Sequence, residues 1–400
     1  MTEIRQPRPV SIDQHGPGLY LHVPFCARSC DFCAFYQVVP HRDDIRRYLE
    51  NVGREVSLCN TRKMATCFVG GGTPSVLHER DLESLGRLLL DAFGGEFEEW
   101  TVEVAPGSVK PGKLRRLKDL GVTRISMGVQ SFQPGMLDAL GRPHSPKQIY
   151  RAFDWIRESG FANVNLDLMF AVPGQDAAQW RSDLEEAIRL KPDHLSTYCL
   201  TFEEDTALYV RLSEGRIERN EATETELYLE TWRFLAAAGY AHYEVSNFAR
   251  PGHQCIHNLN TWRMGDWIGL GPAAASQQDG WRGANPPDLE AWSADLAGGL
   301  RGQSGREGLS PGLLAEDAIV FGLRLSEGVD LAALERRFPG ICFEPLRPFM
   351  KRLEDDGLLV SDGKGRVRLT ESGLLICDAI GAEIMGLVPE RTLVEAGVMK

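Results

Sequence analysis

The sequence contains no run of about 18 consecutive apolar residues, the length that a helix needs to cross a bilayer. We therefore expect no transmembrane helix. The first 17 residues, MTEIRQPRPVSIDQHGP, are polar and lack the apolar stretch of a secretory signal. These two absences predict a cytoplasmic protein. In that compartment the nine cysteines stay reduced, and a tight group of cysteines indicates a metal or redox site.

An excess of positive charge is also missing. The chain carries 44 Lys and Arg against 56 Asp and Glu, a formal net charge of -12. Broad binding to nucleic acid or to anionic membranes depends on clustered Lys and Arg that neutralise phosphates. The composition therefore argues against a nucleic-acid partner.

The usual nucleotide-binding motifs are absent. The segment TCFVGGGTPS has three consecutive glycines after an apolar run, but it lacks both the Walker lysine and the GxGxxG spacing. Glycines without a Cβ atom let the backbone come close to a ligand. This segment predicts a backbone contact with a ligand that is not held by a phosphate loop.

The pattern from residue 18 to about 246 alternates between short apolar or β-branched runs and longer segments with helical periodicity. The expected strands are LYLHV, TCFVG, WTVEV, RISMGV, VNLDLMF, LSTYCL and YEVSN, and the expected helices cover residues 43–59, 79–93, 111–120, 146–158, 176–190 and 222–238. Repeated strand–helix units predict an α/β fold with a parallel sheet, either a complete or partial (β/α) barrel or a doubly wound sheet. In both architectures the ligand site forms at the carboxyl ends of the strands.

Chemically useful side chains follow this rule. The residues concerned lie in, at the end of, or just after five different expected strands: Cys26, Gly70–Gly72, Glu103, Gln130 and Asp167. We expect them to meet at one rim of the sheet. The alternative is that strand ends are polar and glycine-rich in general.

The composition changes after residue 280. Residues 281–310 are rich in Gly, Pro and Ser and predict a linker between a barrel of residues 18–280, preceded by a tail of residues 1–17, and a C-terminal domain of residues 311–400. Short helical patterns and the hairpin GLLVSDGKGRVRLT predict a winged-helix-like α+β module there. Its 15 acidic against 11 basic residues favour packing or a lid over DNA binding.

Three cysteines stand close together in VPFCARSCDFCAFY, at the spacing Cys-x3-Cys-x2-Cys. A loop wrapped around a compact object brings Cys26, Cys30 and Cys33 together, and cysteine thiolates are the usual ligands of iron–sulfur clusters. Three ligands would leave one iron of a [4Fe-4S] cubane open to a small molecule. Two alternatives stay open: a zinc ion with His22 as fourth ligand, although paired two-ligand knuckles are absent, and three purely structural cysteines.

Several ordered motifs carry a resemblance over most of the chain: LYLHVPFCARSCDFCAFY, FVGGGTPS, TVEVAPGSV, RISMGVQSF, LGRPHS, VNLDLMFAVPGQ, YEVSNFARPGHQCIHNLNTWRMGDWIGLGPAAAS and AEDAIVFGLRLSEGVDL. The chain resembles the radical S-adenosylmethionine (radical SAM) superfamily, in the family of oxygen-independent coproporphyrinogen III oxidase and its heme chaperone (HemW) branch. The resemblance implies a partial TIM-like (β/α) barrel with a HemN-type C-terminal domain. It also implies that SAM binds the open iron. An electron from the cluster would then cleave SAM and produce a deoxyadenosyl radical.

The resemblance assigns residues to the cofactors. The cluster falls on Cys26, Cys30 and Cys33, and the SAM contacts fall on Tyr20, Phe35, Gly71, Gly72, Thr73, Glu103, Gln130, Arg142 and Asp167. Carboxylates accept hydrogen bonds from hydroxyls or an ammonium, and arginine pairs with a carboxylate. Taken singly, Arg142 and Asp167 are also compatible with ordinary ion pairs.

Two features distinguish the branches. The oxidase branch has a fourth cysteine where this chain has Phe35, and it has a longer N-terminal segment, so the resemblance favours the heme chaperone branch. That branch has His-Asn-x-x-Tyr-Trp, implicated in heme binding, where this chain has His257, Asn258 and Trp262 with Thr261 in place of the tyrosine. Histidine is a common heme ligand, whereas a His-Asn pair also stabilises loops structurally.

The expected function is therefore heme binding and transfer of heme to an acceptor protein, with a reductant serving the cluster. An oxygen-independent coproporphyrinogen III dehydrogenase, which removes carbon dioxide from propionate side chains by radical chemistry, is the alternative. Another radical SAM tetrapyrrole-modifying enzyme or methyltransferase is the third. Whether the chain is an enzyme is left open by its sequence.

Overall fold

The computed structural model describes residues 16–59 and 63–389. Six neighbouring parallel strands form the centre of a 12-stranded sheet and follow one another in chain order. They are β1 (Gly18–Val23), β2 (Thr66–Gly71), β3 (Glu99–Val104), β4 (Arg124–Gln130), β5 (Asn163–Phe170) and β6 (His194–Cys199). All six match expected strands. Because every strand runs the same way, their carboxyl ends form one rim.

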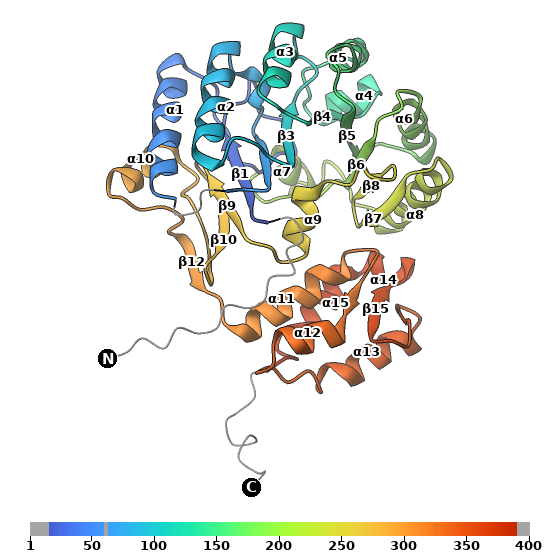
Figure 1. The fold of residues 1–400 in the computed structure, drawn as a ribbon. Coiled ribbons are helices and arrows are strands. Elements are labelled where there is room, and N and C mark those ends of the chain that lie inside the picture. Colours follow the sequence, from blue (N-terminus) through green and yellow to red (C-terminus); the bar gives the residue numbers. More distant parts are fainter. Residues whose placement is uncertain (1–15, 60–62, 390–400) are drawn as a thin grey trace, which may run out of the picture.

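Helices connect these strands and cover the outside of the sheet (Figure 1). The six long ones match the expected helices: α1 (Arg42–Ser57), α2 (Glu79–Phe93), α3 (Pro111–Asp119), α5 (Pro146–Glu158), α6 (Ala177–Arg189) and α8 (Glu221–Ala237). Each buries one apolar stripe; in α5 it consists of Ile149, Ala152, Phe153 and Ile156. Three shorter elements lie in the loops at the rim: η1 (Pro74–Val76), α4 (Pro134–Ala139) and α7 (Ala207–Ser213).

The sheet continues beyond the six strands at both edges. On the β1 side lie β9 (Trp267–Leu270), β10 (Ala275–Gln278), β11 (Trp281–Ala284) and β12 (Ser304–Gly308), and on the β6 side lie β8 (Asn247–Ala249) and β7 (Ala241–Glu244). Strand β9 pairs with β1 in parallel, and the strands added after it are antiparallel. Since β12 and β7 stand at the two ends of the strand order, the sheet is an open, partial barrel, as expected.

The prediction that residues 281–310 form a linker is wrong. This segment forms β11, α10 (Leu289–Ala297) and β12, and so it belongs to the main sheet. Trp292 of α10 is fully buried, lies 5.7 Å from Tyr48 between ring centroids, and donates from its indole nitrogen to Glu55 at 3.2 Å. The glycines and prolines therefore mark tight turns between short elements. The expected seventh strand, YEVSN, is likewise a hairpin of β7 and β8.

The C-terminal residues form a separate α+β module below the barrel in Figure 1. Its elements are α11 (Pro311–Leu323), β13 (Val329–Asp330), α12 (Leu331–Arg337), α13 (Leu346–Asp355), β14 (Leu359–Ser361), β15 (Arg366–Leu369), α14 (Glu371–Leu375) and α15 (Cys377–Ile384). The expected hairpin is present as β14 and β15. The module meets the barrel where Leu325 bridges Glu244 and the Ser326 N–H donates to Tyr243 O at 3.0 Å.

No helix within residues 16–59 and 63–389 is long and apolar enough to span a membrane. Residues 1–15 of the expected N-terminal tail and residues 390–400 of the expected C-terminal domain lie outside the described part of the chain.

Candidate functional site

The three cysteines lie in the loop that leaves the carboxyl end of β1. Backbone hydrogen bonds close the loop at its base, from the Cys26 N–H to Val38 O at 3.0 Å and from the Val38 N–H to Pro24 O at 2.7 Å. A backbone bond from the Cys33 N–H to Cys30 O at 3.2 Å tightens the turn between the second and third cysteines. The loop therefore presents three sulfur atoms from a short, closed segment.

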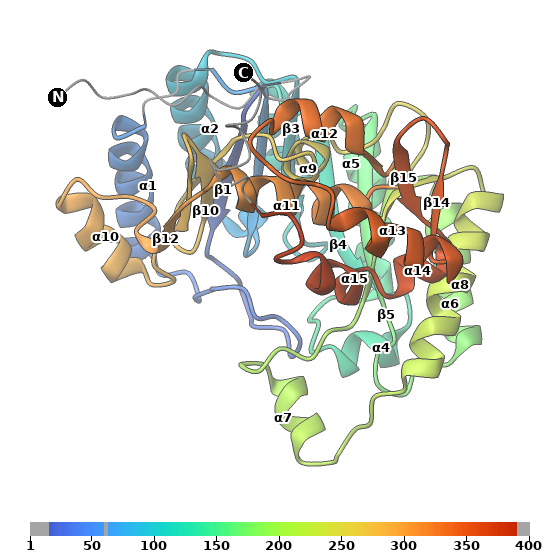
Figure 2. The same ribbon diagram turned by 90° about the horizontal axis from the view of Figure 1, so that it is seen from below.

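Asp31, between the second and third cysteines, fastens the tip of this loop to two rim helices. Its N–H donates to Leu140 O after α4 at 3.1 Å, and its C=O accepts from the Leu208 N–H in α7 at 3.0 Å. Its carboxylate pairs with Arg211 at 2.5 Å. Figure 2 shows α7 standing beside this loop at one edge of the molecule.

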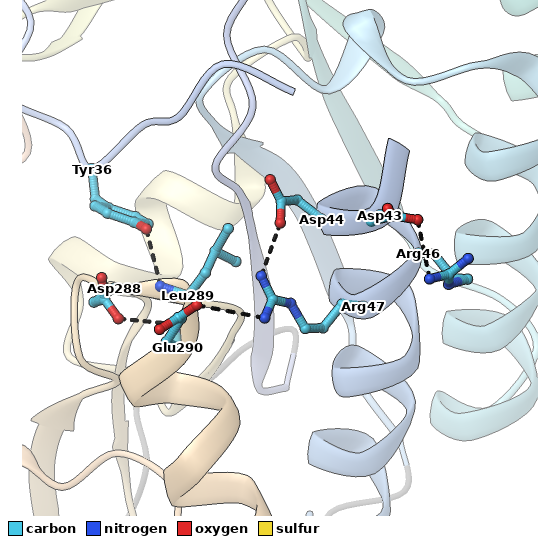
Figure 3. A network of polar contacts seen from close by, with 8 residues as sticks. All are labelled: Tyr36, Asp43, Asp44, Arg46, Arg47, Asp288, Leu289 and Glu290. Atoms are coloured by element: carbon cyan, nitrogen blue, oxygen red, sulfur yellow. Dashed lines mark hydrogen bonds and ion pairs between the residues drawn. The ribbon is translucent and has the colours of Figure 1, made fainter. Parts of the chain in front are cut away.

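The end of the loop is fastened to α10. The Tyr36 hydroxyl accepts a hydrogen bond from the Leu289 N–H at 3.0 Å, at the first turn of that helix (Figure 3). Ion pairs of Arg47 with Asp44 at 2.9 Å and with Glu290 at 3.7 Å run beside it and connect α1 to α10. Helix α10 thus helps to hold the cysteine loop.

His22 is not placed as a fourth ligand for zinc. Its Nδ1 atom lies 3.2 Å from the Tyr20 hydroxyl, and its Nε2 atom lies 2.9 Å from Tyr36 O, so both ring nitrogens have partners. These contacts disfavour the zinc alternative.

The glycine-rich segment lies beside the cysteine loop. Gly71 has φ +96°, and a Cβ atom there would collide with the His22 ring, so the position requires glycine. The N–H groups of Gly72 and Thr73 donate to Val23 O at 2.9 Å and to Phe25 O at 2.8 Å. The Thr73 hydroxyl then lies 3.4 Å from the Cys26 Sγ atom. The second strand loop therefore touches the first cysteine directly.

Two carboxylic acids stand on the neighbouring strands. Glu103 accepts from the Gly71 N–H at 3.1 Å, and Asp167 accepts from Ser126 at 3.1 Å and Asn165 at 2.8 Å. Burial and the charge of Asp167 raise the pKa of Glu103 to about 8. Burial also raises the pKa of Asp167, against the charge of Arg124. Such a pair attracts a ligand that brings hydrogen-bond donors or positive charge.

Arg142 connects β4 to the cysteine loop. Its Nη2 atom donates to Gly128 O at 2.7 Å, and its Nη1 atom lies 3.2 Å from the Cys30 Sγ atom. Its Nε atom is buried without a partner among the described residues. Gln130, with φ +67° at a register shift in β4, has its amide beside Gly128 and Arg142, since a Cβ on Gly128 would touch both side chains. Bulges of this kind re-aim side chains at active sites.

The structure thus brings most of the expected cluster and SAM residues to one rim, linked through Cys26, Thr73, Cys30, Arg142 and Glu103. Tyr20 belongs to the same group. Burial raises the pKa of its hydroxyl, and the nearby charge of Glu103 raises this pKa further. Phe35 differs: its side chain is 69% exposed. This group of three thiols, two carboxylic acids and a guanidinium whose Nε atom has no partner within the described part of the chain fits an iron–sulfur cluster with an amino-acid cofactor.

The expected heme residues lie at the opposite, amino end of the strands. His257 is buried in α9 (Ile256–Trp262), and its Nδ1 atom lies 2.9 Å from the hydroxyl of Thr66, the first residue of β2. The carboxylate of Glu99, the first residue of β3, accepts from the N–H groups of Ile256 at 3.1 Å and His257 at 3.0 Å. Burial lowers the pKa of His257 to about 4, so its imidazole is neutral at pH 7.

The three heme-motif residues do not face one cavity. Trp262 faces the C-terminal module, with its ring 5.8 Å from that of Phe321 and 5.0 Å from the Arg324 guanidinium. It lines a cavity there whose wall does not include His257 or Asn258. Thr261, which replaces the tyrosine, donates back to His257 O at 3.3 Å within the helix.

A buried polar network between the two ends was missed by the sequence reasoning. Asn165 donates from its amide nitrogen to Asp167 at 2.8 Å and accepts at its Oδ1 atom from His194 Nδ1 at 2.6 Å, and His194 Nε2 lies 2.8 Å from the Tyr243 hydroxyl. That hydroxyl accepts from the Cys255 N–H at 3.3 Å, at the start of α9. The available signal was a polar residue at the start of an expected strand, as at His194.

Comparison with known proteins agrees with this architecture. Residues 20–187 match the radical SAM superfamily, and residues 309–376 match the HemN C-terminal domain. The solved structure of coproporphyrinogen III oxidase (HemN) from Escherichia coli superimposes with a TM-score of 0.81 at 23% identity, over 93% of this chain and 91% of that one. This last likeness establishes the fold.

Curated relatives are more similar in sequence. The heme chaperone HemW of Lactococcus lactis is 33% identical over 88% of this chain and 93% of its own length. HemW of Mycobacterium tuberculosis is 33% identical over 92% and 95%, and HemW of Escherichia coli is 38% identical over 64% and 69%. The chain therefore belongs to the radical SAM superfamily and, within it, to the HemW family.

Proposed function

We propose that this chain is a heme chaperone, which binds heme and passes it to an acceptor protein. The single observation that carries the proposal is its identity of 30–33% to HemW proteins over nine-tenths or more of their length. Exposed Phe35, at the position of the fourth cysteine of the oxidase branch, supports it. We place the protein in the cytoplasm, where reduced thiols and a cellular reductant would sustain its cluster.

The rim residues would hold the two cofactors. Cys26, Cys30 and Cys33 would ligate the cluster, and Glu103 and Arg142 would pair with the polar groups of SAM. When bound, a [4Fe-4S] cluster with SAM supplies one-electron chemistry at the open iron. The chain itself positions these groups: Asp31 and Tyr36 fix the loop, and Gly71 lets the backbone pack against His22, which would leave the neighbouring N–H groups near the cofactor.

Heme would be bound at the other end of the barrel, around α9. The neutral imidazole of His257 is in the right protonation state for an iron ligand. Its burial behind Thr66 and Phe68 means that ligation requires α9 to move. The hydrogen-bonded chain from Asp167 to Cys255 would couple a change at the cofactor rim to the position of this helix.

An anaerobic experiment tests the proposal. The chain is reconstituted with iron and sulfide, then titrated with heme and, separately, incubated with SAM, a reductant and coproporphyrinogen III. Stoichiometric heme binding with no decarboxylation supports a chaperone. Formation of protoporphyrinogen would establish the dehydrogenase instead.

Replacing His257 tests the ligand assignment. His257→Ala should weaken heme binding and change its absorption spectrum, because an axial nitrogen is lost. The exposed His78 offers a matched control, and His78→Ala should bind heme as the unmodified chain does. An unchanged affinity and spectrum in His257→Ala would remove this residue from the proposal.

A further inference from the structure

A cavity of about 220 Å³ lies between α9 and the C-terminal module, away from the cysteine loop. Figure 1 shows α9 lying between the barrel and α11 at this place. The cavity is lined by apolar side chains, by three arginines and by two acidic residues. None of the residues assigned to the cluster or to SAM lines this cavity.

The apolar part of the wall comes from both units. Trp262 of α9 contributes its indole, and Leu325, Val329 and Leu334 of the C-terminal module are buried around it. An indole and branched aliphatic groups form a wall that suits a flat apolar ligand.

The charged part of the wall is positive on balance. Of its two acids, Glu327 is paired with Arg263, whose Nη2 atom lies 2.9 Å from it, and Asp330 accepts from the Ala333 N–H at 2.8 Å as the N-cap of α12. Arg366 donates to the backbone carbonyl of Glu327 at 3.1 Å. Because a carbonyl is neutral, this contact does not neutralise the positive charge of Arg366. Three arginines thus face two acids that already have partners.

Arg337, at the end of α12, is the unusual member of this wall. Its Nε and Nη1 atoms are buried and have no hydrogen-bond partner among the described residues. Burial lowers the pKa of its guanidinium, although the charge of Asp266 acts in the opposite direction. A desolvated cation with unused donors beside a cavity is stabilised by an anion that enters it.

We propose that this cavity receives the propionate edge of heme, with the Arg337 guanidinium paired to a propionate carboxylate and the macrocycle edge against Trp262. The inference rests on the proposed function and specifies where the cargo is held. A cavity of 220 Å³ is smaller than sites that enclose a whole ligand of this size, so only one edge of the macrocycle enters. Arginine suits a carboxylate because it offers two parallel donors.

The propionate contact is separable from iron ligation. Arg337 lies in the C-terminal module and His257 in the barrel, and His257 does not line the cavity. A variant at Arg337 therefore tests the carboxylate contact alone, and a heme without free carboxylates provides the matching probe.

The test uses the full-length, cluster-loaded chain under anaerobic conditions. Absorption titrations with heme and with heme dimethyl ester are compared for the unmodified chain, Arg337→Gln, Arg337→Lys and Arg336→Gln. Arg336 is the exposed neighbour on the same helix and serves as the control. Far-ultraviolet circular dichroism checks that each variant is folded.

Arg337→Gln should bind heme about 10 to 100 times more weakly, as expected for loss of a charged hydrogen bond, and should bind the dimethyl ester as the unmodified chain does. Arg337→Lys, which keeps the charge, should recover part of the loss, and Arg336→Gln should lose nothing. Equal heme affinity in Arg337→Gln and the unmodified chain, or an equal loss for heme and ester, would overturn the inference. If the unmodified chain binds no heme, the proposed function itself fails and the inference falls with it.

Discussion

The Nη1 atom of Arg142 lies 3.2 Å from the Sγ atom of Cys30, although 112 positions separate the two residues in the sequence. The same guanidinium donates to Gly128 O at 2.7 Å. One side chain therefore joins the fourth strand of the sheet to the cysteine loop that follows the first strand. The cofactor rim is a connected structure and not only a set of neighbouring strand ends.

Removing this connection should weaken the rim. Arg142→Ala leaves the Gly128 carbonyl without its donor and deprives Cys30 of a nearby positive charge. The proposed pairing of Arg142 with SAM is lost as well, and loss of a hydrogen bond to a charged group costs about 1.5–3 kcal/mol. We expect SAM affinity to fall by about 10- to 100-fold, measured anaerobically by equilibrium dialysis, with Arg115→Ala as the exposed control. Unchanged SAM affinity would show that Arg142 has only a structural role.

Glu103 should give the cluster-free chain an unusual pH dependence. Its pKa is about 8 in the folded state, above its ordinary value of 4.5, so between these values the folded chain holds more protons than the unfolded chain. Stability therefore falls as the pH rises from about 4.5 to about 8 through this group. Glu103→Gln should flatten that part of the curve in denaturant titrations at several pH values.

The matched control is the exposed Glu96. Glu96→Gln should leave the pH dependence of the unfolding free energy as it is. A curve for Glu103→Gln with the same slope as that of the unmodified chain would mean that Glu103 titrates normally in the folded state.

The network in Figure 3 contains two kinds of contact, a hydrogen bond to the backbone of α10 and ion pairs at the surface, and their contributions to stability should differ. Tyr36→Phe removes the acceptor of the Leu289 N–H and should lower the free energy of unfolding by about 1 kcal/mol. Arg47→Ala breaks the ion pairs with Asp44 and Glu290, and it should cost at most about 0.5 kcal/mol because the Arg47 side chain is 45% exposed. Urea unfolding measures both. A larger loss for Arg47→Ala than for Tyr36→Phe would reverse this assignment.

The main sheet could be predicted because its strands and helices carry clear periodicity. Parallel pairing then puts Cys26, Gly71 and Glu103 at one rim, as the strand-end rule requires. The contact of Arg142 with Cys30 does not follow from any pattern, because it depends on how the chain turns after α4. Here the resemblance to a family supplied what local sequence did not.

Other parts were beyond local reasoning for physical reasons. Residues 281–310 have the composition of a linker, yet Trp292 inserts against Tyr48 and turns the segment into part of the fold. The heme motif forms a recognisable string of letters, but only tertiary structure shows that His257 faces the barrel and Trp262 the C-terminal module. Helix geometry separates two side chains that sequence spacing placed together.

The metal content of anaerobically prepared protein tests the central claim most directly. If Cys26, Cys30 and Cys33 hold an iron cubane with one open iron, the reconstituted chain should contain about four iron atoms and its electron paramagnetic resonance signal should change when SAM is added. Cys30→Ala should lose both the iron and the visible absorption. Stoichiometric zinc, or no iron in the unmodified chain, would contradict the account.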